Sequence, residues 1–221
     1  MPTTVYHAEF EELSADTLSR WAAVPVTIAS DIAGIPIAID PRIRPLRAFP
    51  LGKRMVGQAV TAWCERSDFG AMLHALDIAR AGEIVMVDAQ GCLQTAYCGE
   101  ILCGYARRKQ IAGLVVNGAV RDIDTIASWD DFPLFALGNT AKGPLGKERG
   151  SVNGPIAFGG VAVSPGDVVL GDNDGIVVIP LERSAELLAL GEERVRMEAE
   201  WVAALEDGGT LVGTFSVPEA V

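Results

Sequence analysis

The sequence is poor in the residues that nucleophilic and zinc-dependent enzymes use. Its 221 residues include only two histidines and four cysteines. No two cysteines form a CxxC pair, and His74 lies within an amphipathic segment, so a thiolate–imidazole zinc site is not expected. The GxGxxG and GxxxxGKS/T phosphate-binding loops and the GxSxG nucleophile elbow are absent as well. We therefore expect the cysteines to be reduced, buried thiols.

Positive charge and long apolar runs are scarce too. Lysine and arginine total 18 against 29 aspartates and glutamates, which gives a formal net charge of −11. This balance argues against a nucleic-acid surface, which needs clustered cations, although an anionic substrate needs only one or two. No run approaches the ~18 apolar residues of a membrane span, and the first ten residues lack the apolar core of a signal peptide. The expected location is the cytoplasm, with neither nucleic acid nor a membrane as partner.

The spacing of apolar residues predicts a mixed α/β fold. Seven segments have the composition of strands: Met55–Cys64, Glu83–Val87, Ile111–Asn117, Leu134–Leu137, Pro155–Val163, Asp167–Leu170 and Gly175–Ile179. Five are predicted to be helical: Leu13–Ala23, Phe69–Ala81, Gly99–Lys109, Arg121–Ser128 (a helix or a turn) and the charged Leu181–Leu205. Strands and helices alternate in the middle of the chain, whereas strands follow one another near its end. This order indicates sheet packed on sheet with helices outside. We expect one domain over residues 1–221, with a C-terminal helical arm at about 181–205.

Three intervening segments are expected to be irregular. The proline-containing Gly34–Arg47 is predicted to be a loop or an edge strand. Asp88–Gly91 is predicted to be a turn. Gly138–Gly154, which has five glycines, is predicted to be a loop or a flap that faces the substrate. Its cations would attract an anionic substrate or, alternatively, belong to an ordinary solvated loop. They are Lys142, Lys147 and Arg149.

The most informative segment is Val115–Asp124 (VVNGAVRDID). An apolar strand ends there at Asn117 and Gly118 and gives way to Arg121 and Asp122. Proteins with α/β folds usually build their sites at strand ends. A forked guanidinium can hold a carboxylate or an enolate oxygen, and an aspartate oxygen can hold a hard divalent cation. The pair is therefore a candidate substrate and metal site; the alternative is a helix-capping aspartate beside a solvated arginine.

A second candidate lies in the segment AYCGEILCGY. Gly99 precedes a helical run, so the free N–H groups around Glu100, Ile101 and Leu102 can hold an anion. Glu100 would add a carboxylate near a metal. The alternative is a helix whose glycine only permits close packing.

The supply of carboxylates favours a hard cation. With so few histidines and cysteines, a carboxylate–water site for Mg²⁺ or Mn²⁺ fits the composition better than a zinc site. The acidic stretch Glu192–Glu206 offers Glu193, Glu198 and Glu200, which by default form a solvated helix face.

Several segments in this order carry a resemblance to a known family. They are TIASD (27–31), GQAVTA (57–62), GEIVMVDAQG (82–91), CGEILCGYA (98–106), IAGLVVNGAVRD (111–122) and FGGVAVSPGDVVLGDNDGIVVIP (158–180). Together they resemble the class II 4-hydroxy-4-methyl-2-oxoglutarate / 4-carboxy-4-hydroxy-2-oxoadipate aldolases, a family that also contains the regulator of ribonuclease activity A. The resemblance covers roughly residues 27 to 205. It implies a swivelling-type α/β/β/α sandwich that assembles as homotrimers or homohexamers, with the site at the subunit interface.

The resemblance also implies roles for the candidate residues. Arg121 would bind the oxo acid and stabilise the enolate, and Asp122 would anchor Mg²⁺ or Mn²⁺ through a water-rich shell. Glu100 falls where members often have aspartate. The amides of Ile101 and Leu102, after Gly99, fall where the family binds the pyruvate carboxylate.

A catalytic glutamate is expected from the C-terminal helix of a neighbouring subunit. Glu198 is the best match to the family's glutamate, and Glu193 and Glu200 are its rivals. Glu100 or this glutamate would orient the water that removes the substrate's hydroxyl proton.

The implied activity is divalent-metal-dependent retro-aldol cleavage of a 4-hydroxy-2-oxo dicarboxylic or tricarboxylic acid. The products would be pyruvate and a second oxo acid, with oxaloacetate decarboxylation as a side activity, because both reactions leave the enolate of pyruvate. The alternative is a non-catalytic protein that regulates a ribonuclease. Chains of the regulator branch are usually shorter and lack the C-terminal helix, which favours the enzyme here.

Overall fold

The central layer is a mostly parallel sheet. The computed structural model describes residues 2–218. Within them, the parallel strands are β3 (Met55–Cys64), β4 (Ile84–Cys98), β5 (Gly113–Val120) and β6 (Leu134–Asn139). The edge strands are β1 (Thr4–Val5) and β7 (Gly150–Val152) on the β3 side and β2 (Arg44–Pro45) on the β6 side. The runs IVMV of β4 and GLVV of β5 are fully buried, as expected for interior parallel strands that are covered on both faces.

A second layer of strands packs face to face with the first. Its strands are β8 (Ile156–Phe158), β9 (Val161–Val163), β10 (Val168–Gly171) and β11 (Ile176–Ile179). β3 belongs to both layers, because its first four residues pair antiparallel with β10 and its next five pair with β4. Buried side chains from both layers, among them Met86, Val115, Phe158 and Val178, form one apolar cluster between the sheets.

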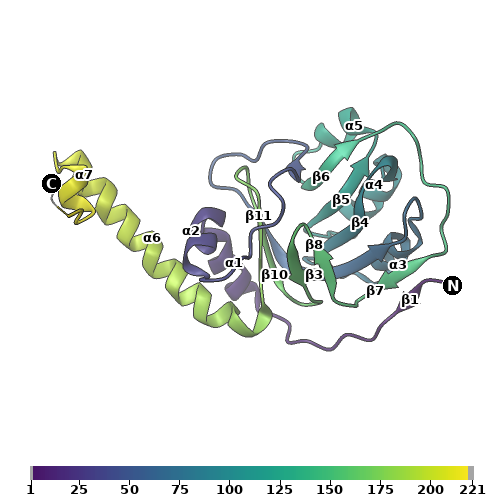
Figure 1. The fold of residues 1–221 in the computed structure, drawn as a ribbon, viewed down its shortest axis with the longest axis horizontal. Helices are drawn as coiled ribbons and strands as arrows, with labels where there is room; N and C mark the ends of the chain where they lie inside the picture. The colour runs from purple at the N-terminus through teal and green to yellow at the C-terminus, as the bar shows by residue number, and fades with distance from the viewer. Residues whose placement is uncertain (1, 219–221) are drawn as a thin grey trace.

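Helices cover the outer face of each sheet (Figure 1). Over the central sheet lie α3 (Gly70–Ile78), α4 (Glu100–Arg108) and α5 (Ile123–Ala127). Over β10 and β11 lie α1 (Ala15–Ala23), α2 (Val26–Ile32) and α6 (Ser184–Glu206), the last preceded by a short 3-10 helix, η1 (Leu181–Arg183). The four layers are α/β/β/α, and the mixed α/β fold with a C-terminal helical arm is confirmed.

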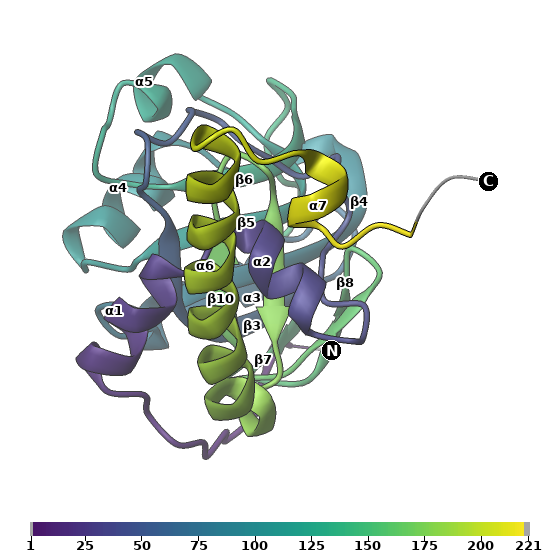
Figure 2. The ribbon, with the colours of Figure 1, turned by 90° about the vertical axis from the view of Figure 1, so that its left-hand side faces the viewer.

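The long helix α6 is anchored to the body through its first half. Leu187 and Leu188 are buried in the apolar cluster that contains Trp21. Arg20 of α1 donates two hydrogen bonds to the carboxylate of Glu192, at 2.7 and 2.8 Å. Farther along, the helix extends away from the sheets as an arm, which Figure 1 shows in profile and Figure 2 shows in front of the body.

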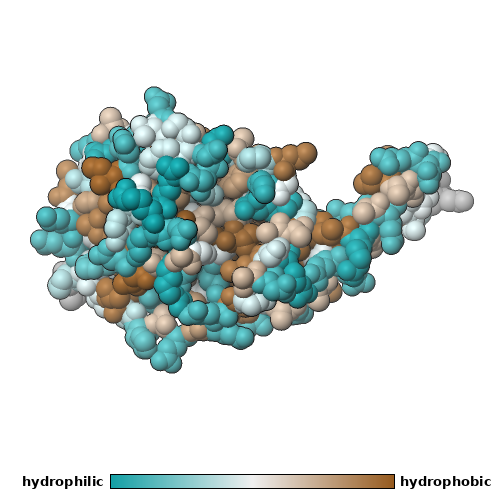
Figure 3. Space-filling view, turned by 180° about the vertical axis from the view of Figure 1, so that it is seen from behind, coloured by the Kyte–Doolittle hydropathy of each residue, from teal (hydrophilic) through white to brown (hydrophobic). Residues whose placement is uncertain are grey.

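The end of the arm folds back on itself and is partly apolar. The chain reverses into α7 (Leu211–Thr214), and the rings of Trp201 and Phe215 pack edge to face with centroids 4.9 Å apart. Figure 3 shows apolar side chains gathered at this tip. The exposed apolar residues of the tip are Val202, Leu211, Val212, Phe215 and Val217.

The structure differs from the sequence-based expectations at three places. The predicted turn Asp88–Gly91 is a bulge within β4, because Gln90 and Gly91 adopt left-handed φ values of 54° and 67° and the strand then resumes its pairing with β5. The predicted strand Pro155–Val163 is a hairpin, β8–β9, which turns at Gly159 and Gly160. The predicted loop Gly138–Gly154 contains a strand, β7, because its last part pairs with the edge of β3.

None of the described helices combines the length and the apolar character that crossing a membrane requires.

Two leucines of α6 differ in burial, so their replacement should change the free energy of unfolding by different amounts. Leu187 is 1% exposed, whereas Leu190 is 41% exposed. Leu187→Ala should lower the free energy of unfolding by about 2–4 kcal/mol, because it opens a cavity in the cluster around Trp21. Leu190→Ala should lower it by less than about 1 kcal/mol. Urea unfolding followed by circular dichroism measures both; equal losses would contradict this account of the anchor.

Candidate functional site

The candidate residues meet where two neighbouring strands end. The N–H of Arg121 donates to the carbonyl of Cys98 at 2.9 Å, which extends the pairing of β4 with β5 beyond Val120. β4 leads directly into α4, and β5 leads into α5. Their starting turns therefore lie together at the carboxyl edge of the sheet. Two segments that the sequence offered separately, Gly99–Leu102 and Arg121–Asp122, form one site.

Asp122 and Arg121 form an accessible pair at this edge. Asp122 has a left-handed φ of 58°, which aspartate tolerates better than most residues. Its Oδ2 accepts a hydrogen bond from the N–H of Glu100 at 3.0 Å and lies 3.7 Å from Nε of Arg121. The two side chains are 43% and 42% exposed, so neither is committed to the packed core.

Glycine at position 99 permits this arrangement. A Cβ at Gly99 would collide with Oδ2 of Asp122 and lie 2.9 Å from Cγ of Arg121. Because the carboxylate must approach the start of α4 to accept the Glu100 N–H, only a residue without a side chain leaves room for it. Gly99 therefore sets the position of the carboxylate rather than contributing a group of its own.

The first turn of α4 presents free amides beside this pair. The N–H of Glu100 is bound to Asp122, and that of Cys103 donates to the carbonyl of Gly99 at 3.0 Å. Within the described chain, the N–H groups of Ile101 and Leu102 have no acceptor. They lie at the positive end of the helix dipole, which favours an anionic group.

A cavity of about 310 Å³ adjoins these groups, on the face of the central sheet that carries α3 and α4. Arg121 and Asp122 form its polar side. Its apolar wall comes from Phe69, Leu73, Tyr97, Leu102 and Pro144. Among the residues described, Arg121 is the one cation and Asp122 the one carboxylate that line this cavity. The site can therefore hold a small anionic molecule with an apolar portion.

Part of the predicted flap borders the cavity. The N–H of Ala96 donates to the carbonyl of Lys142 at 2.7 Å, which fastens the segment to β4. A Cβ at Gly143 would lie 2.8 Å from Nη1 of Arg121, so the backbone passes directly beside the guanidinium. Pro144 then contributes to the apolar wall.

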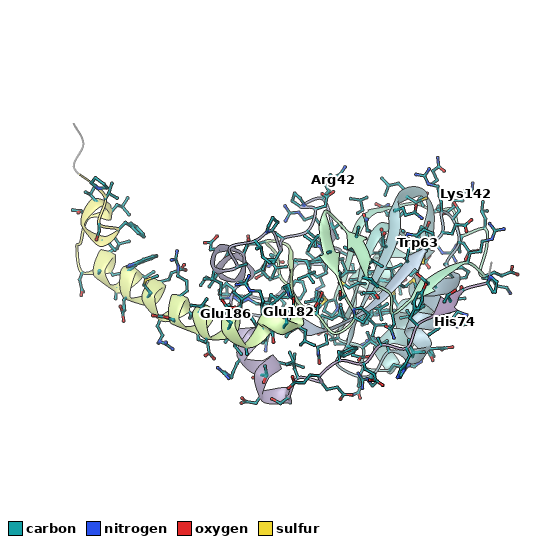
Figure 4. All side chains as sticks on the ribbon, turned by 60° about the horizontal axis from the view of Figure 1, so that its bottom comes forward. Arg42, Trp63, His74, Lys142, Glu182 and Glu186 are labelled. Carbon is teal, nitrogen blue, oxygen red and sulfur yellow. The ribbon has the colours of Figure 1, made fainter. Side chains whose placement is uncertain are left out.

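The cationic side chains of that loop do not line the cavity. Arg149 pairs with Glu65 at 2.7 Å, and Lys147 borders a separate hollow. Lys142 is exposed and lies at the end of the molecule far from the arm (Figure 4). Of the two interpretations of these cations, the placement favours an ordinary solvated loop, because the segment directs its backbone, not these side chains, to the cavity.

The candidate glutamates are placed differently. Glu100 is exposed on the first turn of α4. Glu198 lies on the arm and accepts a hydrogen bond from Arg194 at 2.9 Å, whereas no hydrogen bond or ion pair engages the side chains of Glu193 and Glu200 within the described residues. No residue of α6 lines the cavity, so an arm glutamate can act at this site only in a second copy of the chain.

The donor set at the site suits a hydrated cation rather than a cage. No group of three or more acidic, histidine or cysteine side chains in residues 2–218 is arranged to hold a metal ion. Oδ1 of Asp122 has no hydrogen-bond partner in the same range and is free to bind a cation. Mg²⁺ commonly binds one or two carboxylates and keeps several waters, so the single Asp122 carboxylate fits such an ion.

The four cysteines are free and buried, as expected. Cys98 borders the cavity, but a hydrogen bond with Cys103, together with burial, holds its pKa well above that of an ordinary thiol. Burial likewise raises the pKa of Cys64 to about 12. Both remain neutral at physiological pH, so neither supplies a thiolate nucleophile.

Sequence reasoning missed the apolar wall. Phe69 and Leu73 are four residues apart and face the same side of a helix, a spacing that could have marked them as a pair. Tyr97 stands two residues before Gly99 and could have been included with that segment. Pro144 carries no such signal, because only the hydrogen bonds of its loop bring it to the site.

Comparisons with known proteins identify the family of this chain. The profile of the family described as RraA-like: Aldolase/RraA matches residues 28–178. A protein of Halalkalibacterium halodurans named "Putative 4-hydroxy-4-methyl-2-oxoglutarate aldolase" is 32% identical over 179 residues, which are 81% of this chain and 83% of that protein.

Solved structures show the same fold. An uncharacterized protein from Pseudomonas syringae pv. tomato superposes with a TM-score of 0.80 at 24% identity, over 93% of this chain and 99% of that one. The RNA-processing inhibitor RraA from Thermus thermophilis superposes with a TM-score of 0.64 at 31% identity, over 71% of this chain and 92% of that one.

Two glycines of the same segment test the role of position 99. Gly99→Ala should weaken Mn²⁺ binding at least about 10-fold, because the added methyl group displaces the Asp122 carboxylate. Gly104→Ala is the matched control, since a Cβ there meets nothing closer than 3.5 Å. The loss of the free-ion electron paramagnetic resonance signal measures binding. Equal Mn²⁺ affinity in the two variants would refute the positioning role of Gly99.

Proposed function

This chain belongs to the RraA-like family described as Aldolase/RraA, and from that premise we propose its reaction. We propose that it cleaves a carbon–carbon bond in a small 4-hydroxy-2-oxo acid and releases pyruvate. The observation that carries the proposal is one cavity that combines a guanidinium, a carboxylate and two free amides. These are the groups needed to hold a carboxylate and to stabilise negative charge on the neighbouring oxygen. The name of the Halalkalibacterium halodurans relative supports an aldolase.

The free amides of α4 would orient the substrate. In this proposal the N–H groups of Ile101 and Leu102 bind its C1 carboxylate, which the helix dipole favours. The 2-oxo group then lies toward Arg121 and Asp122. Bound in this way, the substrate directs its remaining carbon atoms toward the apolar wall, which includes Phe69 and Leu73.

Arg121 would stabilise the charge that develops. Removal of the C4 hydroxyl proton lets the C3–C4 bond break; C4 becomes the carbonyl carbon of a second oxo acid, and the bonding electrons remain on the pyruvate fragment as its enolate. Protonation at C3 then gives pyruvate. A fixed guanidinium beside the enolate oxygen lowers the energy of this intermediate without reorganising solvent. Gly143, whose backbone passes beside Nη1, helps to keep the guanidinium in place.

Asp122 is the residue that would hold Mg²⁺ or Mn²⁺, through the carboxylate oxygen that the protein leaves free. When bound, such a cation would withdraw electrons from the 2-oxo acid and so favour enolate formation. The N–H of Glu100 holds the other oxygen of Asp122, and this contact orients the carboxylate before any ion binds.

The hydroxyl proton needs an acceptor. Glu100 is the candidate from the same chain: it is exposed on the first turn of α4, although it is not among the residues that line the cavity. A water oriented by Glu100, or by Glu198 of a second copy, would accept the proton. Decarboxylation of oxaloacetate leaves the same enolate and needs no such base, so we propose it as a side activity of the site.

We propose a homotrimer or homohexamer with the site at the subunit interface. Two features support this assembly. The arm extends beyond the body with an apolar, exposed tip, and its glutamates do not reach the cavity of their own chain. Contact between the tip and a second copy of the chain would bury this apolar surface.

A second candidate function is inhibition of a ribonuclease by protein contact. The observation that favours it is the similarity to the RNA-processing inhibitor RraA from Thermus thermophilis. The C-terminal arm and the cavity favour the enzyme. Pyruvate release from oxaloacetate in the presence of Mg²⁺, followed with lactate dehydrogenase and NADH, separates the two: no release, together with inhibition of RNA cleavage, selects the regulator.

Arg121→Ala should lower kcat for pyruvate release by about 10²–10³, because it removes the positive charge beside the enolate. Arg121→Lys keeps the charge but loses the forked donors, so its activity should lie between that of Arg121→Ala and that of the wild type. Both should fold normally, since the side chain is 42% exposed. Activity of Arg121→Ala within a few-fold of wild type would contradict its role.

Asp122→Asn should raise the Mg²⁺ concentration that gives half-maximal activity by at least about 10-fold, because a neutral amide is a poorer ligand for a hard cation. Asparagine can still accept the Glu100 N–H, so the start of α4 should be preserved. Asp124→Asn is the control, since Asp124 is exposed and does not line the cavity. An unchanged Mg²⁺ titration of Asp122→Asn would move the metal site elsewhere.

A further inference from the structure

A second cavity lies on the opposite face of the central sheet. It has a volume of about 510 Å³ and opens between the β4 bulge and the β8–β9 turn. Asp88, Gln90 and Asn117 line it from the central sheet, and Gly159 and Gly160 line it from the turn. The first cavity adjoins α3 and α4, whereas β8 and β9 pack on the inner, sheet-to-sheet side. The two cavities share no lining residue.

Asp88 is buried but only half satisfied. It is 6% exposed, and its Oδ1 accepts hydrogen bonds from the N–H of Gln90 and from Nδ2 of Asn117, both at 2.9 Å. No donor in residues 2–218 contacts its Oδ2. Oδ2 keeps a small area accessible to solvent, and this area faces the cavity that Asp88 lines.

The two neighbouring amides present acceptors as well. Nδ2 of Asn117 faces the Asp88 carboxylate, and Nε2 of Gln90 donates to the carbonyl of Cys64 at 2.9 Å. A carboxylate and a carbonyl can only accept, so each amide must place its NH₂ group on them. The oxygen of each amide is then left without a donor in the described residues. The inner wall of the cavity therefore carries three side-chain oxygens that have no donor in the described residues, one each on Asp88, Asn117 and Gln90, while each amide NH₂ keeps one further N–H.

The charge of this cavity is negative. Arg42 and Asp40 line its rim, but Arg42 donates to both carboxylate oxygens of Asp40, at distances down to 2.6 Å, so the two charges neutralise each other. Figure 4 shows Arg42 on the outer edge of the molecule. Asp88 is left as the uncompensated charge among the residues that line the cavity. Burial raises the pKa of Asp88 above its usual value, which shows that the protein alone does not stabilise its charge fully.

We propose that this cavity binds a small organic molecule that carries a protonated primary amine. An alkylammonium group has three N–H donors and one positive charge, which suit the uncompensated Asp88 carboxylate and the two neighbouring amide oxygens. Leu93, Leu137 and Ala157 line the same cavity and provide an apolar surface for the carbon chain of such a molecule. The proposal concerns a site separate from the proposed aldolase centre and does not depend on that activity.

Asp88→Asn is a selective test of the site. Asparagine at this position can keep its oxygen on the two donors, Gln90 N–H and Asn117 Nδ2, and this leaves its NH₂ group where the free oxygen was. The variant then presents a donor in place of an acceptor and carries no charge. Since it removes the buried charge and keeps the hydrogen bonds, its melting temperature at neutral pH should not fall.

The experiment titrates n-butylammonium chloride into the full chain at pH 7 and constant ionic strength, with saturation-transfer NMR on the ligand. We expect saturable binding that is at least about 10-fold weaker for 1-butanol, an isosteric neutral ligand. Asp88→Asn should weaken n-butylammonium binding at least about 10-fold. Arg121→Ala, at the other cavity, should leave it unchanged, so failure here and failure of the aldolase proposal are distinguishable.

Four results with the wild type or with Asp88→Asn would overturn the proposal. They are the absence of saturable n-butylammonium binding, equal binding of 1-butanol, equal binding by Asp88→Asn in a folded variant, and displacement of n-butylammonium by equimolar K⁺ or Mg²⁺. The last result would identify an inorganic cation as the occupant. Loss of binding in Arg121→Ala would place the amine at the first cavity instead and would also reject this site.

Discussion

The hydrogen bond from the N–H of Glu100 to the carboxylate of Asp122 is the contact on which the site depends. It joins the beginning of α4 to the beginning of α5, two helices that follow neighbouring strands. It exists because Gly99 has no side chain and because Asp122 adopts a left-handed backbone conformation. With that contact made, one carboxylate oxygen is held, the other is free, and the next two amides of α4 are left without acceptors. A single backbone donor thus fixes the Asp122 carboxylate beside the free amides of α4.

Much of this arrangement follows from local sequence. The strands β3 and β5 and the helix α4 were predicted close to their observed bounds, because their apolar runs and the glycine before α4 are strong local signals. Arg121 and Asp122 could be singled out because they follow an apolar strand, and proteins with α/β folds usually build their sites at strand ends. The parts that could not be predicted are those that depend on distant segments. Pro144 reaches the cavity through a backbone hydrogen bond between Lys142 and Ala96, and no spacing in the sequence announces such a contact.

The β4 bulge illustrates the same limit. The residues Asp88–Gly91 have the composition of a turn, and Gln90 and Gly91 do adopt the left-handed conformation of one. The chain nevertheless returns to β5, because Cys92, Ala96 and Cys98 each find a partner there. Local conformation was therefore predicted correctly while its consequence was not. The bulge lies between Asp88, which lines one cavity, and Gly99, which lines the other.

The arm has a consequence for how order is distributed in the molecule. Up to Val195 the helix α6 packs on a buried cluster of the body, but its remaining turns contact mainly α7 and one another. A free helical segment of this length is only marginally stable in water. The Arg194–Glu198 pair adds about 0.2–0.5 kcal/mol and the Trp201–Phe215 pair about 0.5–1.5 kcal/mol, which is little beside the packing of the body. Amide protons in the outer turns should thus exchange with solvent by local fraying, long before the sheets open. The chain therefore has two regions of different stability. The sandwich unfolds cooperatively, whereas the outer turns of the arm are ordered only as far as their contacts with another surface stabilise them.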